Sequence, residues 1–235
     1  MKKALFAVLT TVSLIFSCVN KVSDLTVIGN IKGLKKGTVY LQQLKDTTLV
    51  VLDSLVIHGE GPFELNADLE ESEVLFLMLD KNGAENSRIA FFADKGVTEI
   101  NTTLKQYALN PEIKGSTQQD KLHEFNDIIK KFNNQGLDLI KEQFEAQQSG
   151  DSNIIEAVSQ KSNNALKRKY LYAINFAMNN KDSEVAPYIA LAEIYDANTK
   201  YLDTIYNALP KHIADSKYGK ELDAFIKKRK LEEKN

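Results

Sequence analysis

The sequence predicts an α+β fold: an N-terminal antiparallel β-sandwich or curled barrel of about seven strands, followed by a C-terminal bundle of about five helices. Two patterns predict it. Up to about residue 113, short β-rich runs alternate with turn residues, and after Gly115 the hydrophobic period changes from two to about 3.6 residues. A hydrophobic content of 43%, with 11 Gly and 4 Pro in 235 residues, indicates an ordinary folded chain.

The β-rich domain is expected over residues 25–115. Its apolar and β-branched runs are separated by segments rich in Gly, Asn and Asp, which favour tight turns. Such a succession of short strands is typical of a small sandwich or a curled barrel. The expected strands are 25–31, 38–44, 49–57, 63–67, 74–79, 88–92 and 97–101.

The helical domain is expected over residues 116–235, and its first helix begins at a capping box. The Ser116 hydroxyl is placed to accept from a backbone N–H of the first turn, and Gln119 is placed to reach back. Apolar residues then recur at helical spacing to about residue 148, with a weak point at Gly136.

Four more helices are expected after this one. Pro187 is tolerated in the third helix because it falls in the first turn. The boundaries follow from capping residues and from Pro210, which cannot continue a helix. The expected helices run from 151–153 to 179–180, from Ser183 onward, from Asn198–Thr199 to Pro210, and from Ser216 through Phe225.

Residues 1–17 have the pattern of a secretory signal peptide. Lys2 and Lys3 precede an apolar run over 4–16, which leads to Ser17 and Cys18. This run of roughly 13 residues is shorter than the roughly 20 that span a bilayer, which disfavours a permanent transmembrane helix.

The segment Ile15-Phe16-Ser17-Cys18 resembles the lipobox of bacterial lipoproteins, although Phe16 is bulkier than the residue usually found there. The resemblance implies that Cys18 is the lipid-attachment residue and the first residue of the mature chain. Residues 18–24 would then form a lipidated tether, held firmly because two or more acyl chains anchor more strongly than one. The alternative is an ordinary cleaved signal with an incidental thiol, which is disfavoured in an oxidising envelope.

Val19 bears on localisation. By resemblance to the sorting rules of Gram-negative lipoproteins, an aspartate after the lipidated cysteine favours retention in the inner membrane, and Val19 stands there instead. We therefore expect a protein of the cell envelope, in the outer membrane rather than the inner, facing the periplasm rather than the cell exterior.

Composition excludes several function classes. With 30 basic and 32 acidic residues the chain lacks the excess of cations expected of a general nucleic-acid binder. One cysteine excludes an intramolecular disulfide, a Cys-x-x-Cys pair and a multi-cysteine zinc site. Three histidines leave little for metal chemistry, so no metal and no cofactor are expected.

Several short motifs, in order, resemble envelope lipoproteins that carry the domain of unknown function 4369. This β-rich module is usually found just upstream of a thioredoxin-like domain. Asp53-Ser54 within a strand and Gly61-Pro62-Phe63 at the start of the next are examples. Together the motifs extend over most of residues 25–226, and they are 51–56, 61–65, 91–97, 113–117, 180–186 and 216–219.

The sequence departs from this family in one respect. Members with the full architecture continue into a redox domain bearing Cys-x-x-Cys, whereas this sequence ends at Asn235 with Cys18 as its one cysteine. Family redox activity is therefore assigned to no residue here. The resemblance implies at most a stand-alone relative of the accessory half of such proteins.

Two clusters of polar residues are weighed as possible sites. One helical face carries Asp120, His123 and Asp127. These residues could form a metal or acid–base site, but a solvated helix face is favoured. The acidic run of Asp68, Glu70, Glu71 and Glu73 could bind Ca²⁺, but without the spacing of an EF-hand a solvated loop is favoured.

Three further features are interpreted structurally. Asp53-Ser54 in an apolar strand lacks a nucleophile elbow, so a hydrogen-bonding role at a strand end is expected. The basic cluster 227–230 is expected to interact with the helix C-terminus, with anionic lipid or a partner as the alternative. Most helical tyrosines are expected in packing, and the rest on a binding surface: Tyr170, Tyr172, Tyr188, Tyr195, Tyr201 and Tyr206.

The expected function is therefore that of a non-enzymatic, lipid-anchored envelope lipoprotein that binds a partner protein, a peptide or an envelope ligand such as a glycan. No catalytic residue is assigned. The alternative is a cofactor-independent hydrolase acting on glycans or peptides through carboxylates brought together by folding. A passive structural element is a third interpretation.

Overall fold

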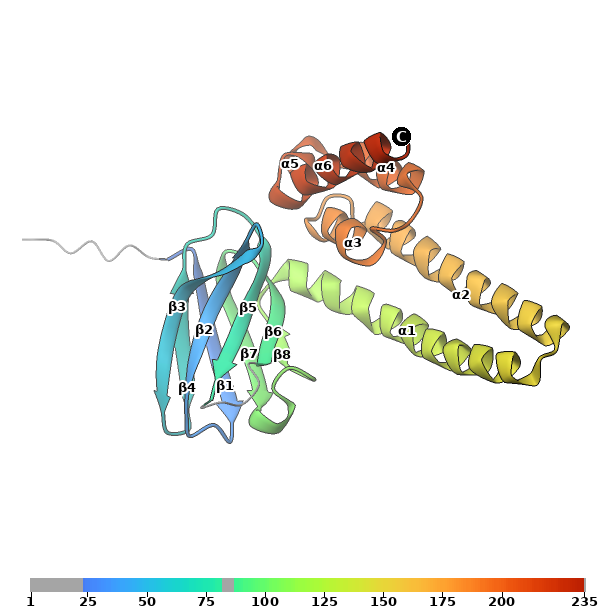
Figure 1. Cartoon of the computed structure of the whole chain (residues 1–235). Coiled ribbons are helices and arrows are strands. Elements are labelled where there is room, and N and C mark those ends of the chain that lie inside the picture. Colours follow the sequence, from blue (N-terminus) through green and yellow to red (C-terminus); the bar gives the residue numbers. More distant parts are fainter. Residues whose placement is uncertain (1–22, 82–86, 235) are drawn as a thin grey trace, which may run out of the picture.

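The computed structural model describes residues 23–81 and 87–234, so Cys18 and the predicted signal peptide lie outside the described residues. Two four-stranded sheets come first in the chain, and the helices follow (Figure 1). The predicted α+β class is confirmed, as a sandwich of two open sheets and not a closed barrel.

All seven predicted strands are present, and one short strand is added. The first sheet has the order β4-β1-β7-β8 and the second the order β3-β2-β5-β6. The eighth strand, β8, is three residues long and pairs with β7, too short a run for alternation to reveal. The strands are β1 (Leu25–Lys32), β2 (Lys36–Lys45), β3 (Thr48–His58), β4 (Pro62–Ala67), β5 (Glu73–Asp80), β6 (Ser87–Ala93), β7 (Gly96–Thr103) and β8 (Glu112–Lys114).

One strand pair departs from the antiparallel expectation. β1 and β7 run parallel, with Leu25 opposite Gly96. The chain leaves β6 of the second sheet and enters β7 of the first sheet at the end where β1 also begins, and the Gly96 N–H donates to the Asp24 carbonyl there at 2.7 Å. Both strands therefore proceed in the same direction across the sheet.

The first hydrophobic core fills the space between the two sheets. Along β1 and β7, buried and more exposed residues alternate, which is typical of strands with one solvated face. β5 is buried nearly throughout because its second face is covered by helices. Fully buried side chains of this core include Leu41, Leu65, Leu75, Leu77, Phe91 and Ile100.

The helices follow the predicted order, with one addition. Gly136 does not interrupt the first helix, because the flanking Phe132 and Leu139 continue its apolar face. The four-residue α5 was not predicted, since it is a single turn between Pro210 and Ser216. The helices are α1 (Thr117–Ser149), α2 (Ser152–Asn179), α3 (Val185–Glu193), α4 (Thr199–Ala208), α5 (Lys211–Ala214) and α6 (Lys217–Glu232), after a short 3₁₀ turn, η1 (Leu104–Gln106).

The predicted capping box is half correct. The Ser116 hydroxyl accepts from the Gln119 N–H at 3.0 Å, as expected of a cap. The Gln119 side chain is directed to the sheet instead, where its Oε1 accepts from the Phe92 N–H at 2.7 Å. Gln119, in the first turn of α1, thus binds the edge strand β6 to the helices.

A second core joins the helices to the outer face of β5 and β6. Phe92 packs edge-on against Tyr188 and Tyr218, with ring centroids 5.5 and 5.6 Å away. Tyr188 and Tyr218 lie 5.2 Å apart in the same manner, which completes a three-ring cluster. The sandwich and the helical part therefore share one apolar junction through Phe92.

Two backbone donors at this junction depend on helical side chains. Val74 and Phe92 lie opposite each other in the β5–β6 ladder. The Val74 N–H donates to the buried Tyr218 hydroxyl at 2.8 Å, as the Phe92 N–H does to Gln119. Both are buried bonds, so the loss of either acceptor would leave a donor unsatisfied.

Gly219 allows Tyr218 to reach this position. A Cβ on Gly219 would lie 2.1 Å from the Ile213 carbonyl oxygen, so only glycine permits α6 to start this close to α5.

We predict that Tyr218→Phe lowers the free energy of unfolding by about 1–3 kcal/mol, because it removes the acceptor of the buried Val74 N–H while keeping the ring. Urea unfolding would measure the change. Tyr195→Phe, at a side chain 55% exposed, is the matched control and should change stability little. Equal effects of the two substitutions would contradict this account of the junction.

Candidate functional site

The longest helices, α1 and α2, form a hairpin that extends away from the sandwich (Figure 1). Near the body, Phe125 stacks on Tyr172 with centroids 5.6 Å apart. Towards the tip the buried residues are smaller, such as Ala146 and Ala165, and Lys161 pairs with Glu142 at 2.6 Å. The distal hairpin thus has a thin apolar seam with much of both helices in solvent.

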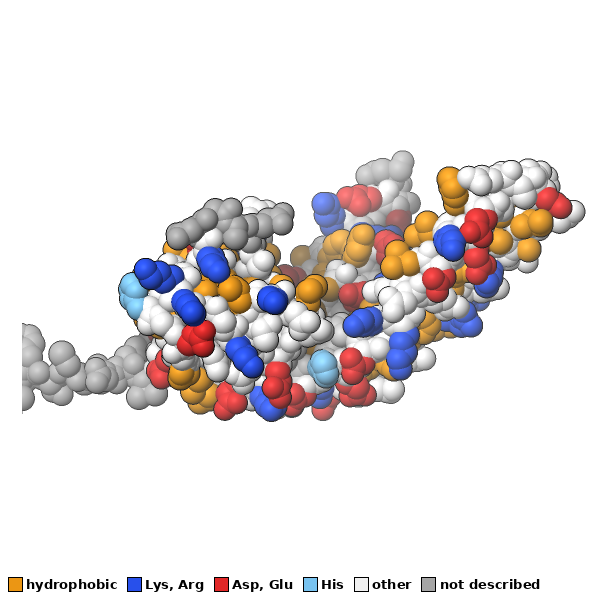
Figure 2. All heavy atoms as spheres, turned by 90° about the horizontal axis from the view of Figure 1, so that it is seen from below, with side chains coloured by type: hydrophobic (Ala, Val, Ile, Leu, Met, Phe, Trp, Pro, Cys, Tyr) orange, Lys and Arg blue, Asp and Glu red, His pale blue; other side chains and the backbone are white. Residues whose placement is uncertain are grey.

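Large apolar side chains are exposed on this hairpin. On α1, Leu137, Ile140 and Phe144 are 67%, 65% and 62% exposed, and on α2 Leu166 and Leu171 are also exposed. Figure 2 shows hydrophobic side chains along the protruding hairpin, interspersed with charged ones. Exposed apolar side chains gathered on one element are typical of an interaction surface.

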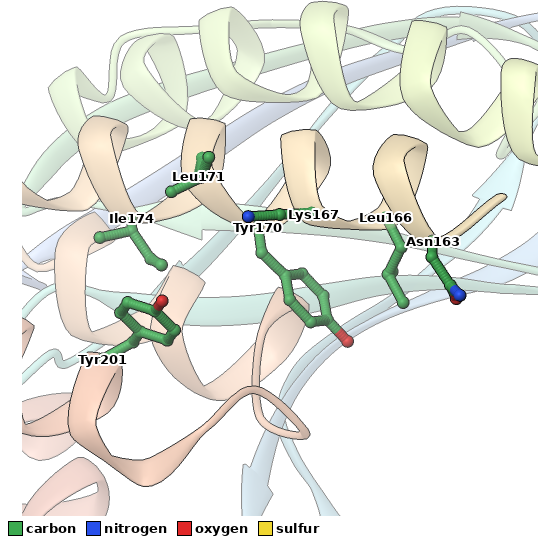
Figure 3. Close-up of a pocket in the computed structure, with 7 residues that line it drawn as sticks. All are labelled: Asn163, Leu166, Lys167, Tyr170, Leu171, Ile174 and Tyr201. Atoms are coloured by element: carbon green, nitrogen blue, oxygen red, sulfur yellow. The ribbon is translucent and has the colours of Figure 1, made fainter. Parts of the chain in front are cut away.

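A groove lies where α2 continues past α4. Its hollow has a volume of about 240 Å³, and the rings of Tyr170 from α2 and Tyr201 from α4 extend into the space between these helices (Figure 3). We call it the α2–α4 groove, lined by Asn163, Leu166, Lys167, Tyr170, Leu171, Ile174 and Tyr201.

Tyr170 of the groove is held by a hydrogen bond to Asp196. Burial, together with a hydrogen bond to the Asp196 carboxylate, raises the pKa of Tyr170 to about 12. The phenol therefore stays protonated at neutral pH and donates to Asp196. This bond fixes one wall of the groove, while Tyr201 remains 41% exposed on the other.

A second hollow of about 540 Å³ adjoins the α2–α4 groove and shares Lys167 and Leu171 with it. We call it the basic hollow, because Lys161, Lys167 and Arg168 line it without a carboxylate. Lys161 pairs with Glu142, and Arg168 donates to the Gln135 amide oxygen at 3.5 Å. Within the described residues Lys167 makes neither a hydrogen bond nor an ion pair. The shared cation is thus available to a ligand.

The lining of the two hollows is mixed in character, apolar and polar. Apolar and aromatic groups with a few polar ones suit recognition. The lining residues supply amides, hydroxyls and cations, but no paired carboxylates and no Ser or Cys nucleophile.

Asp120, His123 and Asp127 lie on an exposed face of α1, which is the solvated face that the sequence favoured. His123 approaches Asp127 at 3.7 Å, and both side chains are largely exposed. Within the described residues, no three His, Cys, Asp or Glu side chains gather in a group that could hold a metal ion. His58 ends β3 and His212 lies in α5.

The acidic run is not simply a solvated loop, and for two of its members that prediction was wrong. Glu71 accepts from the Lys217 N–H at 2.7 Å, at the start of α6. Glu73 is buried and binds both Gln43 and the Lys217 ammonium. Periodicity could not reveal this, because both partners are distant in sequence.

Asp53 has the structural role predicted for it, although in the middle of β3 and not at a strand end. It stands beside an irregularity in the β2–β3 register. Its carboxylate accepts from its neighbour Ser54 and, at 2.8 Å, from the Asn66 N–H of β4. The bond to Asn66 connects the two sheets along one side of the sandwich.

The basic cluster 227–230 is engaged within the chain. Lys227 pairs with Asp223 along α6, and Lys230 reaches Asp203 of α4 at 2.7 Å. Arg229 donates to the carbonyls of Tyr195 and Ala197 at 2.6 and 2.9 Å. The cluster therefore holds α6 against α4 and the loop before it.

The tyrosines divide between packing and surface. Tyr172 and Tyr188 pack in the second core, with Tyr206 partly buried against it. Tyr170 and Tyr201 line the α2–α4 groove, and Tyr195 is exposed. The sequence predicted that some tyrosines pack and others lie on a surface, but not which ones. Tyr170 and Tyr201 line the same groove only because α4 packs on α2.

We predict that Glu184→Gln reduces the loss of stability as the pH rises. Burial raises the pKa of Glu184, although the Ser216 hydroxyl that donates to it opposes the rise. A raised pKa means that the folded state binds more protons than the unfolded state, so stability falls as the pH climbs from 4.5 through the raised value. The difference between variant and native unfolding free energies, measured across that range, should shift in favour of the variant. A difference that stays flat across that range would contradict the prediction.

We also predict that Asp196→Asn lowers the pKa of Tyr170 from about 12, but leaves it above the ordinary 10.0 because the ring remains buried. NMR titration of tyrosines labelled at Cζ would measure this, with Tyr170→Phe to assign the resonance. An unchanged titration would show that the phenol does not donate to Asp196.

Comparison with known proteins finds a family that matches the sandwich. Residues 25–122 match the family described as Domain of unknown function (DUF4369), from the start of β1 into the first turns of α1. No curated protein matches the chain. Among the described helices none is both long and apolar enough to cross a membrane. The β-sandwich of this chain, with the beginning of α1, is thus the part that matches the DUF4369 family.

Proposed function

We propose that the protein is a non-enzymatic, lipid-anchored lipoprotein of the cell envelope that binds a partner protein or peptide through its helical part. The α2–α4 groove is the observation that carries this proposal. It combines exposed leucines, two tyrosines with polar tips and Lys167, which has no ion pair among the described residues.

The anchor is argued from the sequence. The lipobox-like segment ends at Cys18, and the mostly polar residues 20–24 separate it from β1. A lipid on Cys18 would hold the sandwich close to the outer membrane, with the hairpin free to meet other envelope components. A role beside thioredoxin-like proteins rests on the family resemblance alone.

The binding proposal is favoured over the hydrolase because of where the carboxylates lie. Burial raises the pKa of Glu184 and Glu221, the shift expected of a general acid. Glu184 accepts from Ser216, however, and both lie at the sandwich–helix junction and not in the α2–α4 groove. Turnover of a glycan or peptide panel by the purified chain would support the hydrolase.

The anchor is tested by labelling cells with radioactive palmitate. We expect the native chain to incorporate label and to fractionate with the outer membrane, and Cys18→Ala to lose both. An unlabelled native chain that fractionates like the variant would contradict the anchor.

The binding role is tested by photo-crosslinking in cells, with a photoreactive residue at Leu171 or, as control, at Val56. The two side chains are similarly exposed, 43% and 57%, on α2 and β3. We expect a defined adduct from position 171 alone, lost on Tyr201→Arg. Adducts from both positions, or from neither, would count against a binding site in the α2–α4 groove.

A further inference from the structure

The charge on α2 is one-sided and gathered next to the α2–α4 groove. The helix carries Lys161, Lys167, Arg168 and Lys169 against a single acidic residue, Glu156. Lys169 is engaged with Glu193 at 3.4 Å, and Lys161 with Glu142. Lys167 and Arg168 therefore present positive charge beside an apolar surface, with no carboxylate among the lining residues.

The shape of the α2–α4 groove suits a helix. Leu166, Tyr170 and Ile174 are spaced four residues apart on α2, which aligns them in a ridge of the kind that packs against another helix. From Asn163 to Ile174 the ridge is about 17 Å long, or about three turns. α4 already packs against α2 next to this ridge, so the added helix would extend an existing arrangement.

We propose that the α2–α4 groove binds an amphipathic helix of a partner protein, one with an apolar stripe flanked by carboxylates. The apolar stripe lies on Leu166, Leu171 and Tyr201, and a carboxylate of the partner pairs with Lys167. This inference rests on the proposed binding function and names the chemical class of the partner.

A second copy of the chain is a poorer occupant. A symmetric contact through α2 would bring Lys167 and Arg168 of one copy towards the same residues of the other, and like charges at an interface are unfavourable. An anionic bilayer matches the charge but is flat, whereas the hollow lies between two helices. A discrete acidic helix matches both the charge and the shape.

The test uses synthetic fluorescent helical peptides of about 15 residues and the full chain, with binding followed by fluorescence anisotropy. One peptide carries a leucine stripe flanked by glutamates, a second has lysines in place of the glutamates, and a third has the stripe scrambled. We expect the acidic peptide to bind, the basic and scrambled peptides to bind at least about tenfold more weakly, and added salt to weaken the acidic complex.

Charge reversal identifies the contact. Lys167→Glu should weaken the acidic peptide about threefold to tenfold and strengthen the basic one, whereas Lys45→Glu, at an exposed lysine of the sandwich, should change neither. Tyr201→Ala should weaken the acidic peptide about tenfold or more. Circular dichroism would verify that every variant is folded.

Several results would overturn the proposal. These are equal binding of the acidic and basic peptides, no response to Lys167→Glu, concentration-dependent self-association that Lys167→Glu alters, or displacement of the acidic peptide by phosphatidylglycerol vesicles. The test is separate from that of the binding function. If position 171 still crosslinks a partner in cells while the acidic peptide does not bind, the binding function stands and the partner's chemistry has been misassigned.

Discussion

The structure depends on the junction at which helical side chains supply hydrogen-bond acceptors for two buried N–H groups of β5 and β6. The Val74 and Phe92 N–H groups find their acceptors on Tyr218 and Gln119, and the Phe92 ring closes a cluster with Tyr188 and Tyr218. Because buried backbone donors need partners, this edge binds the starts of α1 and α6 at fixed points. The direction in which the α1–α2 hairpin leaves the sandwich follows from that attachment.

The exposed surface of α2 follows from differences in helix length. α2 has 28 residues, but α4, which packs against it, has only 10. The apolar surface of α2 continues beyond this cover, so Leu166 and Leu171 stay in contact with solvent, and Tyr201 of α4 is exposed beside them. Since the ion pairs near the hairpin tip use Lys161 but leave Lys167 free among the described residues, the same stretch is both apolar and positively charged.

Local patterns predicted most of the fold, and contacts between distant residues account for the rest. Alternation located seven strands, and Ser116, Asn198 and Ser216 cap the helices as expected. The parallel β1–β7 pair, the burial of Glu73 and the second role of Gln119 each depend on a partner far along the chain. Tyr170 was foreseen as packing or surface, but its place in the groove is set by how α4 lies on α2.

Ligand binding is expected where α2 extends beyond α4. Hydrogen–deuterium exchange of the full chain, with and without the acidic amphipathic peptide, tests it most directly. We expect slower exchange at 163–174 and at the start of α4, with the strands of the sandwich unchanged. Protection confined to β3 or to the hairpin tip would contradict it, as would an exchange pattern that the peptide does not alter.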